Sequence, residues 1–86
     1  MSRYRVVINK SAEKELIRLP LETIVRIREK ISSLADDPRP DGCKKLKGYK
    51  DLYRIRVSDY RVIYSINDGL LIITVLAVGN RKDIYS

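Results

Sequence analysis

The stretch from residue 52 to residue 64, which reads L-Y-R-I-R-V-S-D-Y-R-V-I-Y, constrains the fold of this chain most strongly. Apolar and polar side chains alternate along it, as in a β-strand with one buried face. Ser58 and Asp59 interrupt the alternation. The pattern therefore predicts a β-hairpin with a two-residue turn. Such a short turn decides which residues pair, because the side chains of a strand alternate with a period of two.

Three arginines share one face of this predicted hairpin. A turn at residues 58–59 places Arg56 directly opposite Arg61 and Arg54 opposite Ile63. Like charges that face each other across two strands destabilise a sheet. Guanidinium groups, however, bind phosphate oxygens in bidentate fashion and keep their charge. The arrangement therefore predicts a binding site for a phosphate chain rather than a feature that stabilises the fold. On the other face, the facing tyrosines 53 and 64 are predicted to lie in the core.

The positive charge of the chain is concentrated around the same hairpin. The net charge is +7, from 18 Lys and Arg against 11 Asp and Glu. Residues 43–61 contain only two acidic side chains and these basic ones: Lys44, Lys45, Lys47, Lys50, Arg54, Arg56 and Arg61. A localised basic patch is typical of nucleic-acid binding. A solvated basic surface and a face for an acidic protein remain alternatives. We predict that Lys44, Lys45 and Lys47 contact RNA at the margin of the site.

The residue types present exclude several chemistries. The chain has no histidine and one cysteine, Cys43. No histidine general base, Ser-His or Cys-His pair, or ordinary zinc site is available, and no cofactor or metal is predicted. The acidic residues between positions 36 and 41 flank prolines and are expected to be solvated loop and capping groups. Cys43 is expected in an exposed loop, without a role.

The remaining patterns predict one α+β domain over residues 1–86. Residues 4–8 read as a first strand, and Ser11 as the N-cap of a short helix that reaches about Leu19. Pro20 separates it from a second helix, which ends near residues 35–36. Residues 36–50 read as a loop. A turn at 67–69 precedes a last strand at 70–78, which is apolar enough to be central in the sheet. We expect the helical hairpin on one face of a sheet that contains the first strand and a three-stranded antiparallel meander.

The end of the last strand extends the predicted site. If that strand lies beside the strand that begins at residue 60, its end lies near Arg61. Arg81 would then join the arginine patch, with Tyr85 as an aromatic side chain for base stacking. A frayed tail is the alternative for both residues. No apolar run approaches the roughly 18 residues of a membrane span, and no signal peptide is recognisable, so an intracellular, cytoplasmic protein is expected.

A basic site without histidine still has a route to RNA cleavage. The ribose 2′-hydroxyl attacks the adjacent phosphate when the two are held in line, and arginines stabilise the negative charge that builds on the phosphorane. Proton transfer is the weak step, because arginine is a poor base and an ordinary tyrosine has a pKa of about 10. Such an enzyme is expected to need another macromolecule that orients its substrate.

These motifs resemble the RelE/ParE superfamily of prokaryotic toxins. The strings L-Y-R-I-R-V-S-D-Y-R-V-I-Y-S-I and V-G-N-R-K-D-I-Y carry the resemblance, and the second favours the RelE branch. The resemblance implies a fold like that of small microbial ribonucleases and a toxin that cuts mRNA in the ribosomal A site. It also implies a cognate antitoxin, and repression of its operon through operator DNA that only the antitoxin complex binds.

The resemblance also assigns roles to particular residues. Arg61 and Arg81 match arginines at the scissile phosphate, and Tyr85 matches a tyrosine that orients the substrate. Arg56 and Arg54 match basic hairpin positions that are often lysine, so no lysine base is available there. A ParE-like toxin that acts on DNA gyrase, and an inactive relative kept as an antitoxin-bound regulatory module, are the two alternatives. Cleaved mRNA or damaged DNA after induction would distinguish them.

Overall fold

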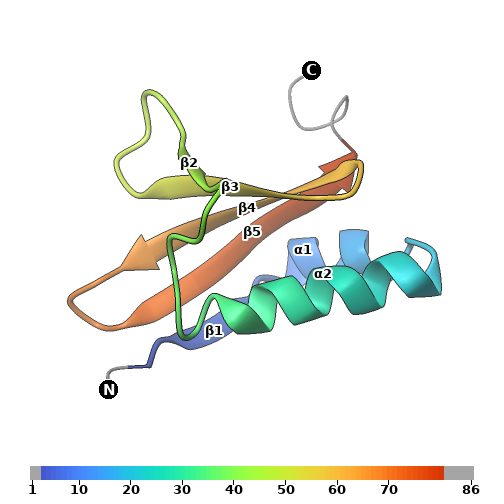
Figure 1. The fold of residues 1–86 in the computed structure, drawn as a ribbon, viewed down its shortest axis with the longest axis horizontal. Helices are drawn as coiled ribbons and strands as arrows, with labels where there is room; N and C mark the ends of the chain where they lie inside the picture. The colour runs from blue at the N-terminus through green and yellow to red at the C-terminus, as the bar shows by residue number, and fades with distance from the viewer. Residues whose placement is uncertain (1–2, 81–86) are drawn as a thin grey trace.

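The computed structural model describes residues 3–80 of the 86-residue chain. Its elements are, in order, β1 (Arg5–Ile8), α1 (Lys10–Leu16), α2 (Leu21–Ser33), β2 (Lys44–Lys45), β3 (Leu52–Val57), β4 (Tyr60–Asn67) and β5 (Ile72–Asn80). All the strands of this part of the chain form one sheet, and both helices cover the same face of it (Figure 1). The predicted α+β class and the one-sided placement of the helices are confirmed.

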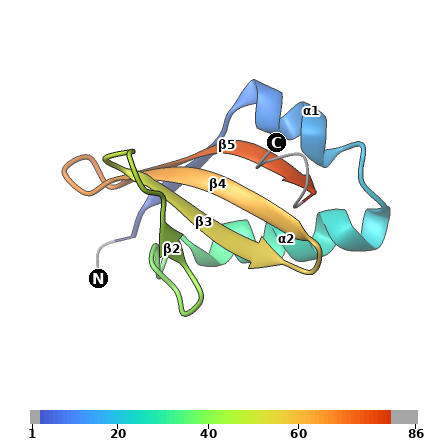
Figure 2. The same cartoon turned by 90° about the horizontal axis from the view of Figure 1, so that it is seen from above.

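The sheet has the order β1-β5-β4-β3-β2. β1 runs parallel to β5, and the remaining neighbours are antiparallel. β5 therefore has a partner strand on each side along its first half, which explains why it is apolar at nearly every position. Seen from above, no helix of residues 3–80 covers the face opposite α1 and α2, which we call the open face; α2 lies beneath β3 and α1 beside the far end of β5 (Figure 2).

The predicted register of the β3–β4 hairpin is confirmed. Arg56 pairs with Arg61, and Arg54 pairs with Ile63. The two-residue turn works because Ser58 adopts a positive φ of 54°, which suits the twist of a tight hairpin. One short turn and strict alternation were enough to place every side chain of this hairpin on the correct face.

Both helices begin close to the predicted positions, with one correction. Helix α1 starts at Lys10, and its N-cap is Asn9, whose side-chain oxygen accepts a hydrogen bond from the Lys10 amide at 3.0 Å. The predicted N-cap, Ser11, was wrong, because an earlier residue already caps the helix. α1 also ends at Leu16, before the expected limit, while α2 follows Pro20 as predicted.

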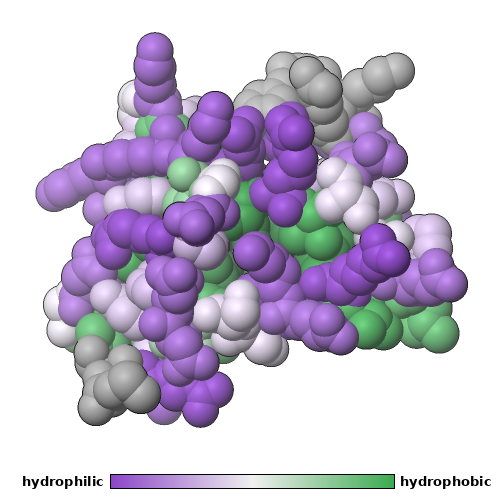
Figure 3. All heavy atoms as spheres, in the orientation of Figure 1, coloured by the Kyte–Doolittle hydropathy of each residue, from purple (hydrophilic) through white to green (hydrophobic). Residues whose placement is uncertain are grey.

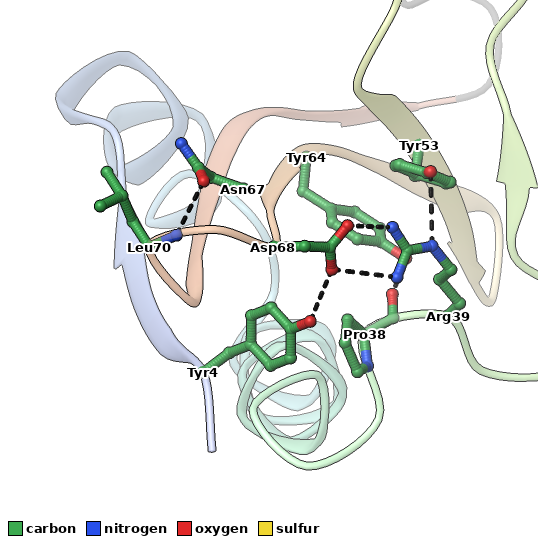
Figure 4. Close-up of polar contacts among 8 residues, drawn as sticks. All are labelled: Tyr4, Pro38, Arg39, Tyr53, Tyr64, Asn67, Asp68 and Leu70. Carbon is green, nitrogen blue, oxygen red and sulfur yellow. Dashed lines mark hydrogen bonds and ion pairs between the residues drawn. The ribbon is translucent and has the colours of Figure 1, made fainter. Parts of the chain in front are cut away.

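The connection between β4 and β5 is longer than the predicted turn at residues 67–69. β4 continues to Asn67, which pairs with Ile72, so four residues form the loop and the last strand begins two residues later than expected. Leu71, the last residue of this loop, has a positive φ of 55°, so extended backbone resumes only at Ile72. The Asn67 side chain accepts a hydrogen bond from the Leu70 amide at 2.9 Å and closes the loop (Figure 4).

The hydrophobic core lies between the helices and the covered face of the sheet. Its centre combines Leu16 and Ile27 from the helices with Val62, Tyr64 and Val75 from the sheet, all fully buried. The predicted tyrosine pair is part of this face, with the rings of residues 53 and 64 stacked at 6.0 Å between centroids. The prediction that these tyrosines belong to the core is confirmed.

Residues 36–50 are more ordered than a simple loop. Lys44 and Lys45 form the short strand β2 against β3, which corrects the prediction of a loop throughout. The sulfur of Cys43 lies 3.1 Å from the hydroxyl of Tyr64, and Cys43 is half-buried rather than exposed. The same hydroxyl donates to the Pro38 carbonyl at 2.8 Å. These contacts attach the loop to the core.

A cluster of polar side chains holds the loop against the β4–β5 connection (Figure 4). We call Tyr4, Arg39, Tyr53 and Asp68 the Arg39 cluster. Arg39 pairs with Asp68 at 2.8 Å and lies over the ring of Tyr53 at 5.1 Å from its centroid. The Tyr4 hydroxyl donates to Asp68 at 2.6 Å. The Arg39 guanidinium, followed by the Tyr4 hydroxyl, lowers the pKa of the Asp68 carboxyl below its usual value.

Neither helix of residues 3–80 has the length and apolar character needed to cross a membrane.

Candidate nucleic-acid interface

The arginines lie on the open face of the sheet, at the end where β5 finishes. Residues that pair across antiparallel strands point to the same side. The pairing therefore aligns Arg56, Arg61 and Gly79 in one row across β3, β4 and β5. Because Gly79 carries no side chain, no β5 side chain stands beside Arg61 in this row. The expectation that the last strand ends beside Arg61 is confirmed.

The next row carries a second pair of cations. It aligns Lys44, Arg54, Ile63 and Ala77 across four strands. Lys44 and Arg54 lie at one side of this row, whereas Ile63 and Ala77 are apolar and form a floor. Positive charge on β2 and β3 thus borders an apolar surface on β4 and β5. This combination suits a nucleotide, which presents a phosphate together with the flat aromatic face of a base.

Arg61 is the most enclosed member of the arginine patch. At 3% exposure it is the one polar or charged residue classed as buried among residues 3–80, whereas Arg56 is exposed and Arg54 is half-buried. The surrounding residues restrict the conformation of a side chain that is buried to this extent. A charge held in place before substrate arrives needs little reorganisation when negative charge develops nearby.

The other predicted residues fall into three groups. Lys44 faces the same side as Arg54, and Lys47 lies at the rim of a cleft described below. Lys45 pairs with Tyr53 and therefore faces the other side of the sheet, so the structure does not bring it together with the arginines. Arg81 and Tyr85 lie outside the described residues.

A cleft of about 970 Å³ follows the open face and continues around the end of β5 to α1. Its lining is mostly apolar along the sheet and carries polar groups at its ends. The lining residues are Glu15, Arg18, Leu19, Leu46, Lys47, Tyr49, Leu52, Tyr60, Ile63, Ala77, Val78, Gly79 and Asn80. Figure 3 views the molecule from the side and shows hydrophilic atoms over most of this side, with hydrophobic atoms exposed between them.

Helix α1 closes one side of the cleft. β1 pairs with β5 only as far as Val75, so among residues 3–80 no strand lies on that side of the later part of β5. The Glu15 carboxylate accepts a hydrogen bond from the Val78 amide at 3.1 Å and covers part of this edge. The contact attaches α1 to the strand that carries Gly79. It also places Arg18 and Leu19 along the cleft.

Tyr49 lines the cleft, although it is not among the site residues predicted from the sequence. Tyr49 is 60% exposed, and Leu46, Lys47 and Leu52 line the cleft near it. Its signal was present in the sequence, because an aromatic residue sits between Lys47 and Lys50 in a segment with a turn glycine. Aromatic residues among basic ones are typical of single-strand binding surfaces.

The described residues offer electrostatic stabilisation more than proton transfer. Arg54, Arg56 and Arg61 supply fixed positive charge to the open face. Within residues 3–80, no group of three or more Cys, Asp or Glu side chains is arranged to hold a metal ion. The geometry therefore favours positioning of a phosphodiester and stabilisation of the charge on its oxygens.

A family model and several known proteins match this chain. The model of the ParE toxin of the type II toxin–antitoxin system parDE matches residues 6–85. A protein of Methanocaldococcus jannaschii named Toxin RelE3 is 35% identical over 94% of this chain and 94% of its own length. The mRNA interferase toxin RelE of Escherichia coli is 29% identical over 96% of this chain and 90% of its own length.

The fold matches solved structures over almost all its length. A chain in the crystal structure of the archaeal RelE-RelB complex from Pyrococcus horikoshii superposes with a TM-score of 0.82. The two sequences are 40% identical, and the match covers 94% of this chain and 97% of that one.

Proposed function

Because the chain belongs to the ParE toxin family of type II toxin–antitoxin systems, and within it to the RelE branch, we propose that it is an endoribonuclease toxin that cuts mRNA. The observation that carries the proposal is the position of Arg61. It is buried and pairs across the sheet with Arg56 and with Gly79, and Gly79 lines the cleft on the open face.

The proposed reaction is a transfer within the RNA. The 2′-oxygen forms a bond to phosphorus, the bond from phosphorus to the 5′-oxygen breaks, and a proton moves from the 2′-hydroxyl to the departing 5′-oxygen. Arg61 and Arg81 hold the phosphate oxygens, and Arg56 adds charge beside them. Tyr85 orients the nucleotide. Arg54, Lys44 and Lys47 bind the neighbouring phosphates.

We propose that this cleavage depends on the ribosome. The cations Arg54, Arg56 and Arg61 are poor general bases, and lysine is absent from these hairpin positions. The ribosomal A site would supply the alignment of the mRNA that this small protein lacks. An alignment of attacking and leaving oxygens accounts for several orders of magnitude in rate in comparable reactions.

The antitoxin and the place of action complete the proposal. Two of the related solved structures, from Pyrococcus horikoshii and Escherichia coli, are toxin–antitoxin complexes of RelE with RelB, which supports a cognate antitoxin for this chain. We propose that the antitoxin either covers Arg54, Arg56, Arg61 and Arg81 or displaces the C-terminal tail that carries Tyr85. We also propose that operator DNA is bound only through the antitoxin complex and that the toxin acts in the cytoplasm, where translating ribosomes are found.

Induction of the gene in a bacterium tests the proposal. Primer extension on cellular mRNA should reveal new 5′ ends within coding regions, and coexpression of the adjacent antitoxin gene should abolish them. Purified protein should cut mRNA on programmed ribosomes and leave the same RNA intact without ribosomes. Equal rates in both reactions would refute ribosome dependence. Damaged DNA with intact mRNA would instead indicate a gyrase toxin.

A further inference from the structure

The segment that precedes β3 presents two side chains at the rim of the cleft. The Tyr49 amide donates to the Leu46 carbonyl at 3.4 Å, and the Leu46 amide donates to the Leu52 carbonyl at 2.9 Å. Gly48 has a φ of 82°, as the third position of a type II turn requires. The backbone of the turn is therefore held at both ends while Lys47 and Tyr49 project from it.

Tyr49 differs from the other tyrosines of residues 3–80. Tyr4 bonds to Asp68, Tyr53 and Tyr64 stack on each other, and Tyr60 packs against the core. Tyr49 is the one tyrosine of this part of the chain that the structure leaves mostly exposed, at 60%. Its ring contributes to the wall of the cleft rather than to the fold, so the core does not explain its presence.

The surroundings of Tyr49 match the chemistry of a nucleotide. Lys47, two residues earlier, supplies a cation, and Leu52, Ile63 and Ala77 supply an apolar floor. The cleft then continues to Gly79, which pairs with Arg61. A single RNA strand laid along it would meet a ring and a lysine at one end and the buried arginine at the other.

We propose that Tyr49 stacks on an RNA base away from the scissile phosphate, while Lys47 binds a phosphate next to that base. This inference rests on the proposed function and adds a contact that sets the affinity and register of the RNA. A base offers its flat face to any aromatic ring, so the contact tolerates every base. A purine has the larger ring surface, and we expect a preference for purines at this position.

Binding of a non-cleavable RNA measures the contact directly. The probe is a fluorescein-labelled, 2′-O-methylated single-stranded RNA, and the dissociation constant is read from anisotropy. Removal of one base stack by Tyr49→Ala should weaken binding about 5- to 150-fold. Tyr49→Phe, which keeps the ring, should recover most of the lost affinity. Leu70→Ala, which truncates a side chain 69% exposed in the β4–β5 loop, is the matched surface control and should bind as the unmodified protein does.

The salt dependence separates stacking from charge. Lys47→Ala should reduce the slope of the logarithm of affinity against the logarithm of salt concentration by about 0.7, because one phosphate contact is lost. Tyr49→Ala should leave this slope unchanged. If Tyr49 merely supported the turn, its removal would displace Lys47 and lower the slope as well, and that result would overturn the proposal.

A tryptophan at position 49 reports on the stack itself. The chain contains no tryptophan, so Tyr49→Trp introduces a single emitter. The RNA should quench its emission, and an RNA with abasic sites should quench it much less. Leu70→Trp should remain unquenched. Equal quenching at both positions, full affinity of Tyr49→Ala, or no RNA binding by the unmodified protein at low salt would each overturn the proposal. Ribosomal mRNA cleavage that depends on Arg61 would keep the proposed function intact in any of these cases.

Discussion

The two ends of the sheet use arginine in opposite ways. At the end where β4 turns into β5, Arg39 pairs with the carboxylate of Asp68 and lies over the ring of Tyr53. These contacts attach the loop after α2 to the sheet. At the other end, Arg56 and Arg61 face each other across two strands. An arginine beside a carboxylate stabilises the fold, whereas two arginines side by side oppose it and attract an anion. The neighbours of an arginine, more than the residue itself, therefore indicate its role.

The largest expected effect comes from Arg61. Arg61→Gln should reduce mRNA cleavage on ribosomes roughly 100- to 1,000-fold, as loss of one preorganised donor to a developing anion does elsewhere. Primer extension and single-turnover cleavage measure the effect, and circular dichroism checks that the variant is folded. Arg39→Gln is the matched control and should cleave at close to the normal rate. Comparable loss in both variants would break the distinction between the two ends.

A smaller effect is expected from the buried tyrosine near the Arg39 cluster. Tyr64→Phe removes a hydroxyl that donates to the Pro38 carbonyl and contacts the sulfur of Cys43. The free energy of unfolding should fall by about 0.5–1.5 kcal/mol, as measured by urea denaturation. Cleavage by the folded variant should be unchanged, because the hydroxyl lies under the loop and not on the open face. Unaltered stability would show that these contacts do not hold the loop.

The ion pair of the Arg39 cluster should contribute less. The Arg39 and Asp68 side chains are 45% and 56% exposed, so solvent screens their attraction. Arg39→Gln should lower the melting temperature by roughly 1–8 °C, as expected for a surface pair in a domain of this size. Arg56→Gln, at the opposing end, should leave it unchanged or raise it, because a like-charge contact is relieved. A fall in the melting temperature of both variants would contradict the comparison.

The smallest effect concerns acid stability. The pKa of Asp68 is lowered in the folded protein, first by its bond to Arg39 and then by Tyr4. A lowered pKa stabilises the fold above the ordinary aspartate value of about 4, and the benefit disappears as the pH falls through the lowered value. The melting temperature should therefore drop less between pH 6 and pH 3 in Asp68→Asn than in the unmodified protein. An equal drop in Asp68→Asn and in the unmodified protein would contradict a stabilising role of the Asp68 carboxylate.

Local patterns predicted the arginine end of the molecule well. The pairing of Arg56 with Arg61 followed from alternation and a two-residue turn, both of which act between near neighbours in the sequence. The Arg39 end was not foreseen. Arg39 and Asp68 are 29 positions apart, and no local pattern connects them. The contact exists only because the loop after α2 folds back over the sheet. The roles of Arg81 and Tyr85 remain predictions, because both residues lie outside the described part of the chain.

The sequence by itself determined the hairpin, the α+β class and the likeness to a toxin family, because each depends on periodicity or on motifs of adjacent residues. Tertiary structure alone decided three other features: the burial of Arg61, the strand formed by Lys44 and Lys45, and the cleft that Tyr49 borders. Burial and clefts depend on what distant segments leave uncovered. In this chain, the small residues Ala77 and Gly79 leave space on the open face, and only their pairing with Ile63 and Arg61 places that space beside the arginine.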